Sequence, residues 1–295
     1  MSLFPVDDNN NERRRQRPRR QEEQLKSEDG RSRLQARDQA EKLTRKEALN
    51  ELVVSSSKAV VDITTNRLKA KYTFARMVGD GNFAAVYRAT EVGSGAVWAI
   101  KEVERRKLKG KSYCHIENEA ELMSVCKHDN ICRLKAGYRT TKFYYLVLEY
   151  AEKGDLFEAI KLRGAFGDSA SSASTLRDVA CALDYLHTRG VVHRDVKPEN
   201  LLLSSAHGRT TVKLTDFGLA CRADGPLYRV CGTPTYVAPE ILSGDGYGPA
   251  VDVWSLGVIG HILLVGYAPF RSKEKTQLFK LIRGGEVDYR LPVLD

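Results

Sequence analysis

One segment, residues 193–200, limits what this chain can fold into more than any other feature. It carries Asp195, Lys197 and Asn200, and apolar residues at 191–192 and 201–203 flank it. This pattern predicts a short extended loop held between two apolar strands. In such a loop an aspartate suits the acceptance of a hydroxyl proton, a lysine steadies a transferred phosphate, and an amide holds a metal ion. The alternative, three unrelated polar residues in a turn, is disfavoured by the complete segment.

A second carboxylate follows a short apolar run that ends at Leu214. Asp216 comes two residues later and is followed by Phe217 and Gly218. A hard cation such as Mg²⁺ prefers carboxylate and amide oxygens, phosphate and water. We therefore predict that Asp216 and Asn200 bind Mg²⁺ that bridges nucleotide phosphates.

A glycine-containing turn lies between two predicted strands near residue 80. Gly79 and Gly81 allow a tight turn whose N–H groups approach phosphate oxygens. A Gly-x-Gly turn alone is also compatible with an ordinary hairpin, and Ala84 stands where a third glycine would make the loop more flexible. The predicted nucleotide-binding turn consists of Val78, Gly79, Asp80, Gly81, Asn82, Phe83, Ala84, Ala85 and Val86.

Lys101 ends the apolar run that begins at Ala96. A lysine at a strand end is commonly a solvated charge, but after the glycine turn it can hold nucleotide phosphates if a carboxylate orients it. Glu119, in a predicted helix, is the candidate, because Met123 four residues later would share its inward face. We predict that Lys101 and Glu119 act together.

The pattern of the chain changes twice, at Tyr72 and after Gly154. Short β-rich runs between residues 72 and 150 predict a strand-rich N-lobe, and helical patterns in 151–295 predict a helical C-lobe, an α+β fold of two lobes with a cleft between them. The expected strands are Tyr72–Val78, Ala85–Glu91, Ala96–Val103, Ile131–Thr140 and Phe143–Glu149. The expected helices are Cys114–Lys127, Asp155–Leu162, Thr175–Arg189, Asp252–Val265 and Lys273–Gly284.

Residues 1–71 differ from the rest in being basic and polar. Residues 1–33 hold almost no apolar side chains, so we expect disorder there, while 34–54 permits a solvated helix. The arginine cluster between Arg13 and Arg20 fits a nuclear-import or phosphate-binding patch, or a solvated tail that keeps the protein soluble. Nucleic acid is the less favoured partner, because apart from this cluster the net charge of +9 is spread along the chain.

The six cysteines show neither zinc-site spacing nor the density of a secreted disulfide scaffold. No run approaches the roughly 18 apolar residues of a membrane helix, and the charged N-terminus has no signal-peptide core. We expect a cytoplasmic or nuclear protein that is not inserted in a membrane. The sequence predicts no oligomeric state.

From residue 72 to residue 295 the chain resembles the eukaryotic protein kinases. The motifs that carry the resemblance are the glycine turn, Ala99–Lys101, His193–Asp195, Asp216–Gly218 and Ala238–Glu240, in the family's order. Lys197 and Thr233 resemble the serine/threonine branch. The run 224–240 resembles the calcium/calmodulin-dependent group and, within it, the doublecortin-like kinases, although residues 1–70 do not resemble doublecortin domains.

The resemblance implies ATP and Mg²⁺ as cofactors and assigns further roles. Leu148 would be the gatekeeper, Glu149 and Ala151 would receive adenine through their backbone, and Val86, Ala99 and Leu202 would enclose it. The stack that reports the active state would comprise Met123, Leu134, His193 and Phe217. Substrate-binding residues would be Asp155, Glu199 and Thr233, the two acids receiving an arginine three residues before the phosphorylated Ser or Thr.

Two departures from the family pattern qualify this reading. Arg229 stands where many kinases carry a phosphorylatable threonine, so we expect activity that does not depend on phosphorylation there. Relatives continue through helices beyond the one predicted at 273–284, so we expect a C-lobe that is incomplete at Asp295 and a Glu240 without its usual arginine. The alternative function is a kinase-like scaffold that binds ATP with little activity.

Overall fold

The computed structural model describes residues 59–80, 84–108, 112–163, 169–206 and 208–287. All of them belong to one compact unit of the chain. The expected helix at 34–54, the arginine cluster at 13–20 and the turn residues Gly81, Asn82 and Phe83 lie outside these ranges. Within them, no helix combines the length and apolar character needed to cross a membrane.

A six-stranded sheet forms the N-lobe, in the order β1-β5-β6-β4-β3-β2. Neighbouring strands are antiparallel except β1 and β5, which are parallel. In β4 Trp98 and Ile100 are buried on one face and Val103 on the other, so both faces of this strand are covered. The strands are β1 (Val60–Asp62), β2 (Tyr72–Asp80), β3 (Ala84–Glu91), β4 (Val97–Glu104), β5 (Leu134–Arg139) and β6 (Phe143–Glu149).

Strand β1 and helix α2 (Thr65–Lys71) precede Tyr72, where the sequence pattern placed the start of the domain. The hydroxyl of Thr64 caps α2 by accepting a hydrogen bond from the Arg67 N–H at 3.3 Å. Leu68 is buried with Tyr72 in a cluster that also contains Trp98. Strand β1 thus adds a strand to the sheet and α2 packs against the sheet through Leu68, so residues 60–71 belong to the folded N-lobe rather than to the tail. They escaped prediction because their few apolar residues show no clear period.

Helix α3 (Ser112–Val125) packs against β1 and β5. Ile116, Ala120 and Met123 are buried at helical spacing, which fixes the face that α3 turns toward the sheet. Glu119 lies on this buried face, between Ile116 and Met123.

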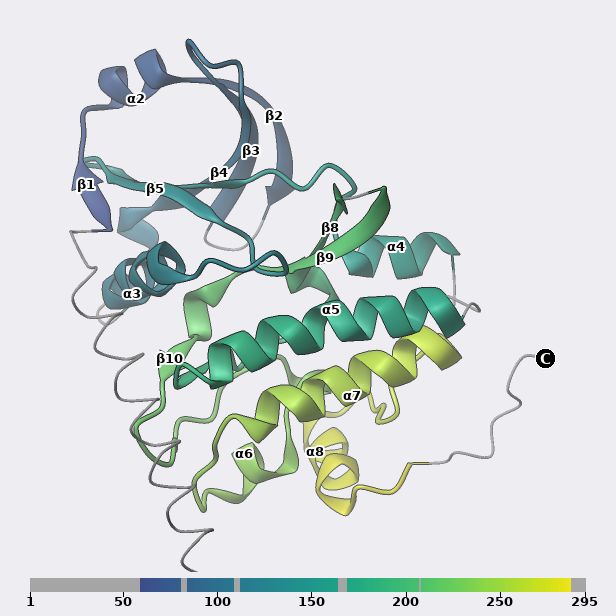
Figure 1. Ribbon diagram of the computed structural model, residues 1–295. Coiled ribbons are helices and arrows are strands. Elements are labelled where there is room, and N and C mark those ends of the chain that lie inside the picture. Colours follow the sequence, from purple (N-terminus) through teal and green to yellow (C-terminus); the bar gives the residue numbers. More distant parts are fainter. Residues whose placement is uncertain (1–58, 81–83, 109–111, 164–168, 207, 288–295) are drawn as a thin grey trace, which may run out of the picture. The chain divides into compact units, whose positions relative to one another are not determined.

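The C-lobe is mainly helical, so the mixed α+β fold with a sheet-containing N-lobe and a helical C-lobe is confirmed. Helices α5 and α7 lie side by side (Figure 1). A continuous core joins Leu146 and Leu148 of β6 to Leu183 of α5 and Leu263 of α7. The helices are α4 (Leu156–Arg163), α5 (Ser169–His187), α6 (Pro239–Ser243), α7 (Ala250–Val265) and α8 (Lys275–Gly284), and the short strand pairs are β7 (Val191–Val192) with β10 (Cys221–Arg222) and β8 (Leu201–Ala206) with β9 (Arg209–Leu214).

Candidate active site

Lys101, at the middle of β4, lies between two carboxylates. Its Nζ is 2.7 Å from Oε1 of Glu119 on α3 and 2.9 Å from Oδ1 of Asp216. The Glu119 side chain is 1% exposed, whereas that of Asp216 is 44% exposed. The structure therefore brings together three predicted residues from a strand, a helix and a loop, with Asp216 open to solvent.

Their mutual charges determine the protonation of this trio. Burial opposes the charge on Lys101, but Glu119 and Asp216 outweigh burial and raise the pKa of Lys101 above its ordinary value. Lys101 is the main reason that the pKa of Asp216 is lowered, against the effect of burial. Burial raises the pKa of Glu119, and Lys101 opposes that rise. At neutral pH the trio holds a fixed cation beside a solvent-facing carboxylate.

Asp195 is the centre of a second polar cluster. Its Oδ1 accepts hydrogen bonds from the Thr233 N–H at 3.0 Å and from the Thr233 hydroxyl at 2.7 Å. Its Oδ2 lies 2.8 Å from Nζ of Lys197, which also donates to the Thr233 hydroxyl at 3.0 Å. Nδ2 of Asn200 donates to the Asp195 carbonyl at 2.8 Å. The predicted residues of the 193–200 loop and Thr233 thus form one hydrogen-bonded group.

Asp252, in the first turn of α7, fixes the backbone of this loop. It is completely buried, and its carboxylate accepts hydrogen bonds from the N–H of His193 at 2.9 Å and of Arg194 at 2.8 Å. His187 Nε2 lies 2.8 Å from the same carboxylate. The sequence predicted a helix that begins at Asp252, but did not indicate that this residue contacts the loop. The sequence signal for this contact was an acidic residue in the first turn of an otherwise apolar helix.

Backbone conformation is unusual at two positions of the site. Among the described non-glycine residues, only Arg194 (φ 67°) and Asp216 (φ 61°) have positive φ. Such angles are costly and persist where surrounding contacts enforce them. Here the contacts include Asp252 below Arg194 and, beside Asp216, an edge-to-face pair of His193 and Phe217 with ring centroids 5.1 Å apart. The two loops are therefore held in defined positions.

Apolar residues predicted to enclose adenine lie close together. Leu148 belongs to the main core, and Ala99 and Leu202 pack against it. Ala99 is opposite Leu148 in the β4–β6 pairing, and Val86 is opposite Lys101 in the β3–β4 pairing. The predicted stack of Met123, Leu134, His193 and Phe217 also meets here, with Met123 and Phe217 in the main core and Leu134 packed against it.

The described part of the glycine turn forms the ends of two paired strands. Gly79 is opposite Val86 and Asp80 is opposite Ala85, so Val78 and Ala84 lie within β2 and β3. Glu149 ends β6, and its N–H donates to the Arg133 carbonyl at 2.9 Å. Ala151 follows two residues later along the chain. The paired ends of β2 and β3 and the segment that follows β6 therefore lie beside Lys101 and Leu148.

The two acids predicted to bind substrate lie on neighbouring elements. Asp155 precedes α4, and its Oδ1 accepts a hydrogen bond from the Glu158 N–H at 2.8 Å, which makes it a helix cap. Glu199 is exposed in the short 3-10 helix Pro198–Asn200, which packs against α4. Asp155 therefore has a structural role whatever its part in binding.

The oxygen donors of Asn200 and Asp216 fit Mg²⁺. Nδ2 of Asn200 is engaged by Asp195, so its amide oxygen is the atom that could ligate. The described residues contain no group of three or more His, Cys, Asp or Glu that could hold a metal ion. Mg²⁺ is commonly held by one or two carboxylates together with substrate phosphates, so two protein donors suffice.

A buried glutamate that braces a strand lysine, beside a solvent-facing aspartate and an Asp–Lys–Asn loop, is the arrangement of a protein kinase. The sequence profile described as "Protein kinase domain" matches residues 72–290, and the chain belongs to this family. Protein kinases generally use ATP and Mg²⁺.

Curated relatives share this part of the chain. The serine/threonine-protein kinase DCLK2 of Rattus norvegicus is 45% identical over 231 residues, which cover 77% of this chain and 30% of the relative. DCLK1 of the same organism is 44% identical over 228 residues, covering 76% and 52%. The serine/threonine-protein kinase GD17699 of Drosophila simulans is 42% identical over 245 residues, covering 82% and 33%. The chain thus spans about a third to a half of the length of these relatives, and the predicted resemblance to doublecortin-like kinases is confirmed.

Proposed function

We propose that this chain transfers the γ-phosphoryl group of ATP to the hydroxyl of Ser or Thr in protein substrates. The observation that carries the proposal is the placement of Lys101 between Glu119 and Asp216. Phosphoryl transfer needs positioning and electrostatic stabilisation more than covalent chemistry. An assembled Lys101 site of this kind favours an enzyme over a scaffold.

In this proposal the reacting hydroxyl lies at Asp195. As the new O–P bond forms and the bond to the leaving ADP breaks, the hydroxyl proton passes to the Asp195 carboxylate. Lys197 offsets the negative charge of the transferred group. Thr233 binds both Asp195 and Lys197 and so fixes their relative positions. Lys101, braced by Glu119, holds the α- and β-phosphates.

The remaining predicted residues bind the nucleotide. Asn200 and Asp216 would hold Mg²⁺, which when bound neutralises phosphate charge. The turn from Val78 to Val86 would cover the phosphates, and Ala99, Leu148 and Leu202 would enclose the adenine beside the backbone of Glu149 and Ala151. No covalent enzyme intermediate is expected.

The proposed activity is tested with three peptides that differ only in the acceptor residue. Each has arginine three residues before a Ser, a Thr or a Tyr and is incubated with the full chain, Mg²⁺ and γ-labelled ATP. We expect label on the Ser and Thr peptides and at most a trace on the Tyr peptide. Absence of transfer to all three would contradict the proposal, and equal labelling of the Tyr peptide would contradict the Ser/Thr assignment.

We predict that activity does not require phosphorylation of the segment around Arg229. The guanidinium of Arg194, which a phosphate would otherwise bind, donates to the Leu219 carbonyl at 2.7 Å and to the Tyr247 hydroxyl at 3.3 Å. The Tyr247 hydroxyl in turn donates to the Arg229 carbonyl. Phosphatase treatment should leave kcat/KM within about twofold, whereas Tyr247→Phe should lower it roughly threefold to tenfold, since a net hydrogen bond contributes about 1 kcal/mol.

Tyr228→Phe is the matched control, because Tyr228 lies on the same segment and is 66% exposed. It should behave as the unaltered chain. Loss of activity on phosphatase treatment, or equal effects of the two tyrosine substitutions, would count against this account of the segment.

We further propose that Asp155 and Glu199 select substrates with arginine three residues before the acceptor. Asp155→Asn keeps a helix cap while removing the charge, since Asn caps as well as Asp. Combined with Glu199→Gln, it should raise KM roughly threefold to tenfold for the arginine peptide, as expected for charge-assisted contacts at a partly exposed site. KM for a peptide with alanine at that position should not change.

Glu158→Gln, an exposed acid in the first turn of α4, is the control for a general loss of negative charge. If this control raises KM for the arginine peptide as much as the double substitution does, the assignment of Asp155 and Glu199 is wrong.

A further inference from the structure

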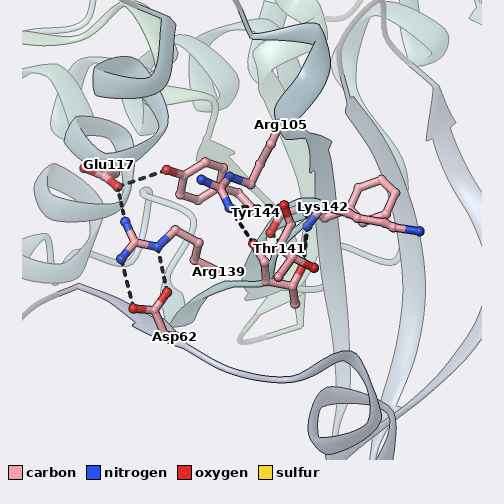
Figure 2. Close-up of polar contacts among 9 residues, drawn as sticks. Asp62, Arg105, Glu117, Arg139, Thr141, Lys142 and Tyr144 are labelled. Atoms are coloured by element: carbon pink, nitrogen blue, oxygen red, sulfur yellow. Dashed lines mark hydrogen bonds and ion pairs between the residues drawn. The ribbon is translucent and has the colours of Figure 1, made fainter.

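Arg139, the last residue of β5, joins two elements that flank it. Its guanidinium binds Asp62 of β1 through two contacts, Nε to Oδ1 at 2.7 Å and Nη2 to Oδ2 at 2.9 Å. Its third nitrogen, Nη1, donates to Oε1 of Glu117 on α3 at 3.0 Å. Figure 2 shows Arg139 between the two carboxylates, with the Tyr144 hydroxyl also pointing to Glu117, at 3.0 Å. One side chain thus links β1, β5 and α3.

Backbone and apolar contacts place β1 beside α3 independently of these charges. β1 pairs in parallel with β5, and the Ile63 N–H donates to the Arg139 carbonyl at 2.9 Å. Val60 packs against the cluster that contains Ile116 of α3. At Gly137 a Cβ atom would lie 2.5 Å from the Ala59 carbonyl oxygen, a distance at which one of the two must move. β1 can approach β5 this closely only because residue 137 is glycine.

Arg139 contacts α3 on the face opposite to the one that contacts Lys101. Glu117 is 47% exposed, whereas Glu119, two residues later, is 1% exposed, and residues two apart on a helix point in nearly opposite directions. The Lys101 contact therefore holds α3 from inside and the Arg139 contact holds it from outside. A helix held on both faces resists the rotation that would withdraw Glu119.

We propose that Asp62, Arg139 and Glu117 form a clasp that positions α3, so that strand β1 controls how well Glu119 braces Lys101. Arg139 is a positioning residue in this arrangement and does not touch substrate. The inference rests on the proposed role of Glu119. If it holds, the segment before Tyr72 helps to determine activity. A ligand or partner that separates β1 from β5 would then inhibit the enzyme.

The size of the effect follows from the exposure of the groups. Arg139 and Glu117 are partly exposed and Asp62 is 73% exposed, and exposed ion pairs contribute little individually. The two-point contact between a guanidinium and a carboxylate is stronger than a single pair. We expect Arg139→Met to lower kcat/KM roughly threefold to tenfold rather than to abolish activity.

Lys135→Met is the matched control for this substitution. Lys135 lies on the same strand, is also basic and partly exposed, and pairs with Glu91 of β3 instead of with α3. It should leave kcat/KM within about twofold, because it removes only a partly exposed ion pair with Glu91 and a contact over the Trp98 ring, and neither of these involves α3. Equal losses in the Arg139 and Lys135 variants would overturn the clasp.

A role through Glu119 is separated from simple destabilisation by combining substitutions. In a Glu119→Gln background Arg139→Met should change kcat/KM by less than about twofold, because groups that act as a unit are not additive. The same loss in both backgrounds would overturn the proposal. If Glu119→Gln itself left activity unchanged, the proposed role of Glu119 would fail, and the proposal with it.

Hydrogen exchange gives a second measurement that does not depend on activity. The amides of residues 115–125 should exchange several-fold faster in Arg139→Met and in Gly137→Ala than in the unaltered chain, and no faster in Lys135→Met. Gly137→Ala should have the same effect, because it displaces β1 although Asp62, Arg139 and Glu117 are all unsubstituted. Unchanged exchange in both variants would overturn the clasp even if their activity fell.

Discussion

Asp195→Asn should lower kcat for phosphoryl transfer by about 10²–10⁴-fold, the usual contribution of a positioned acid or base. The amide has the size of the carboxylate and can still accept the two hydrogen bonds from Thr233. It cannot accept a proton, and it offers Lys197 no charge. The affinity for ATP should stay within about twofold, because in the proposed mechanism Asp195 contacts the acceptor hydroxyl rather than the nucleotide.

The measurement is a steady-state assay on a Ser peptide together with titration of the protein with ATP. Asp184→Asn, an exposed acid on α5, serves as the control and should retain full activity. Equal kcat values for the unaltered chain and Asp195→Asn would refute the proposed role of Asp195. A parallel loss of ATP affinity would indicate that the substitution disturbs the nucleotide site instead.

Lys101→Met should lower kcat/KM by about 10²–10³-fold, the cost of removing one preorganised contact to the nucleotide phosphates. It should also destabilise the fold, since removal of one partner of a buried pair typically costs about 3–5 kcal/mol. The partner left buried without a cation is Glu119, whereas Asp216 is 44% exposed. Urea unfolding measures this second effect.

The destabilisation should depend on pH. Burial raises the pKa of Glu119 and Lys101 opposes the rise, so Lys101→Met raises this pKa further. A carboxyl whose pKa is higher in the folded than in the unfolded state takes up a proton on folding. Stability is then lost as the pH rises from the unfolded value, about 4.3, through the folded one. Lys101→Met should therefore cost less stability at pH 5 than at pH 7.

The control is the double variant Lys101→Met with Glu119→Gln, which removes the titrating group. Its stability relative to the unaltered chain should vary less between pH 5 and pH 7 than that of Lys101→Met. A cost of Lys101→Met that is the same at both pH values would show that Glu119 does not bear an unpaired charge in the variant.

Much of the fold and site could be predicted because the chemistry is concentrated in short segments. Asp195, Lys197 and Asn200 are close in sequence, so their spacing alone predicted a common loop. Pairing of Lys101 with Glu119 was predicted because a strand lysine needs a buried carboxylate to orient it. The assignment of Leu148, Glu149 and Ala151 to the nucleotide needed the family resemblance, since each would suit any core or connection.

Contacts between distant segments could not be predicted in this way. Asp62 and Arg139 are 77 residues apart, and each is an ordinary surface residue in its own segment. β1 and β5 can lie this close together because residue 137 is glycine, and nothing in the sequence around Gly137 signals this close approach. Asp252 lies far along the chain from the loop that it binds, and only the fold brings its carboxylate to the backbone of His193.

Asp252 changes how substitutions in α7 should be interpreted. None of the residues predicted to touch ATP or substrate lies on this helix, yet its first turn supplies the carboxylate that holds the N–H groups of His193 and Arg194. A sequence variant that shifts α7 by a fraction of an ångström moves the neighbouring Asp195 with it. Variants in this apolar helix therefore belong with active-site variants, even where they leave the protein well folded.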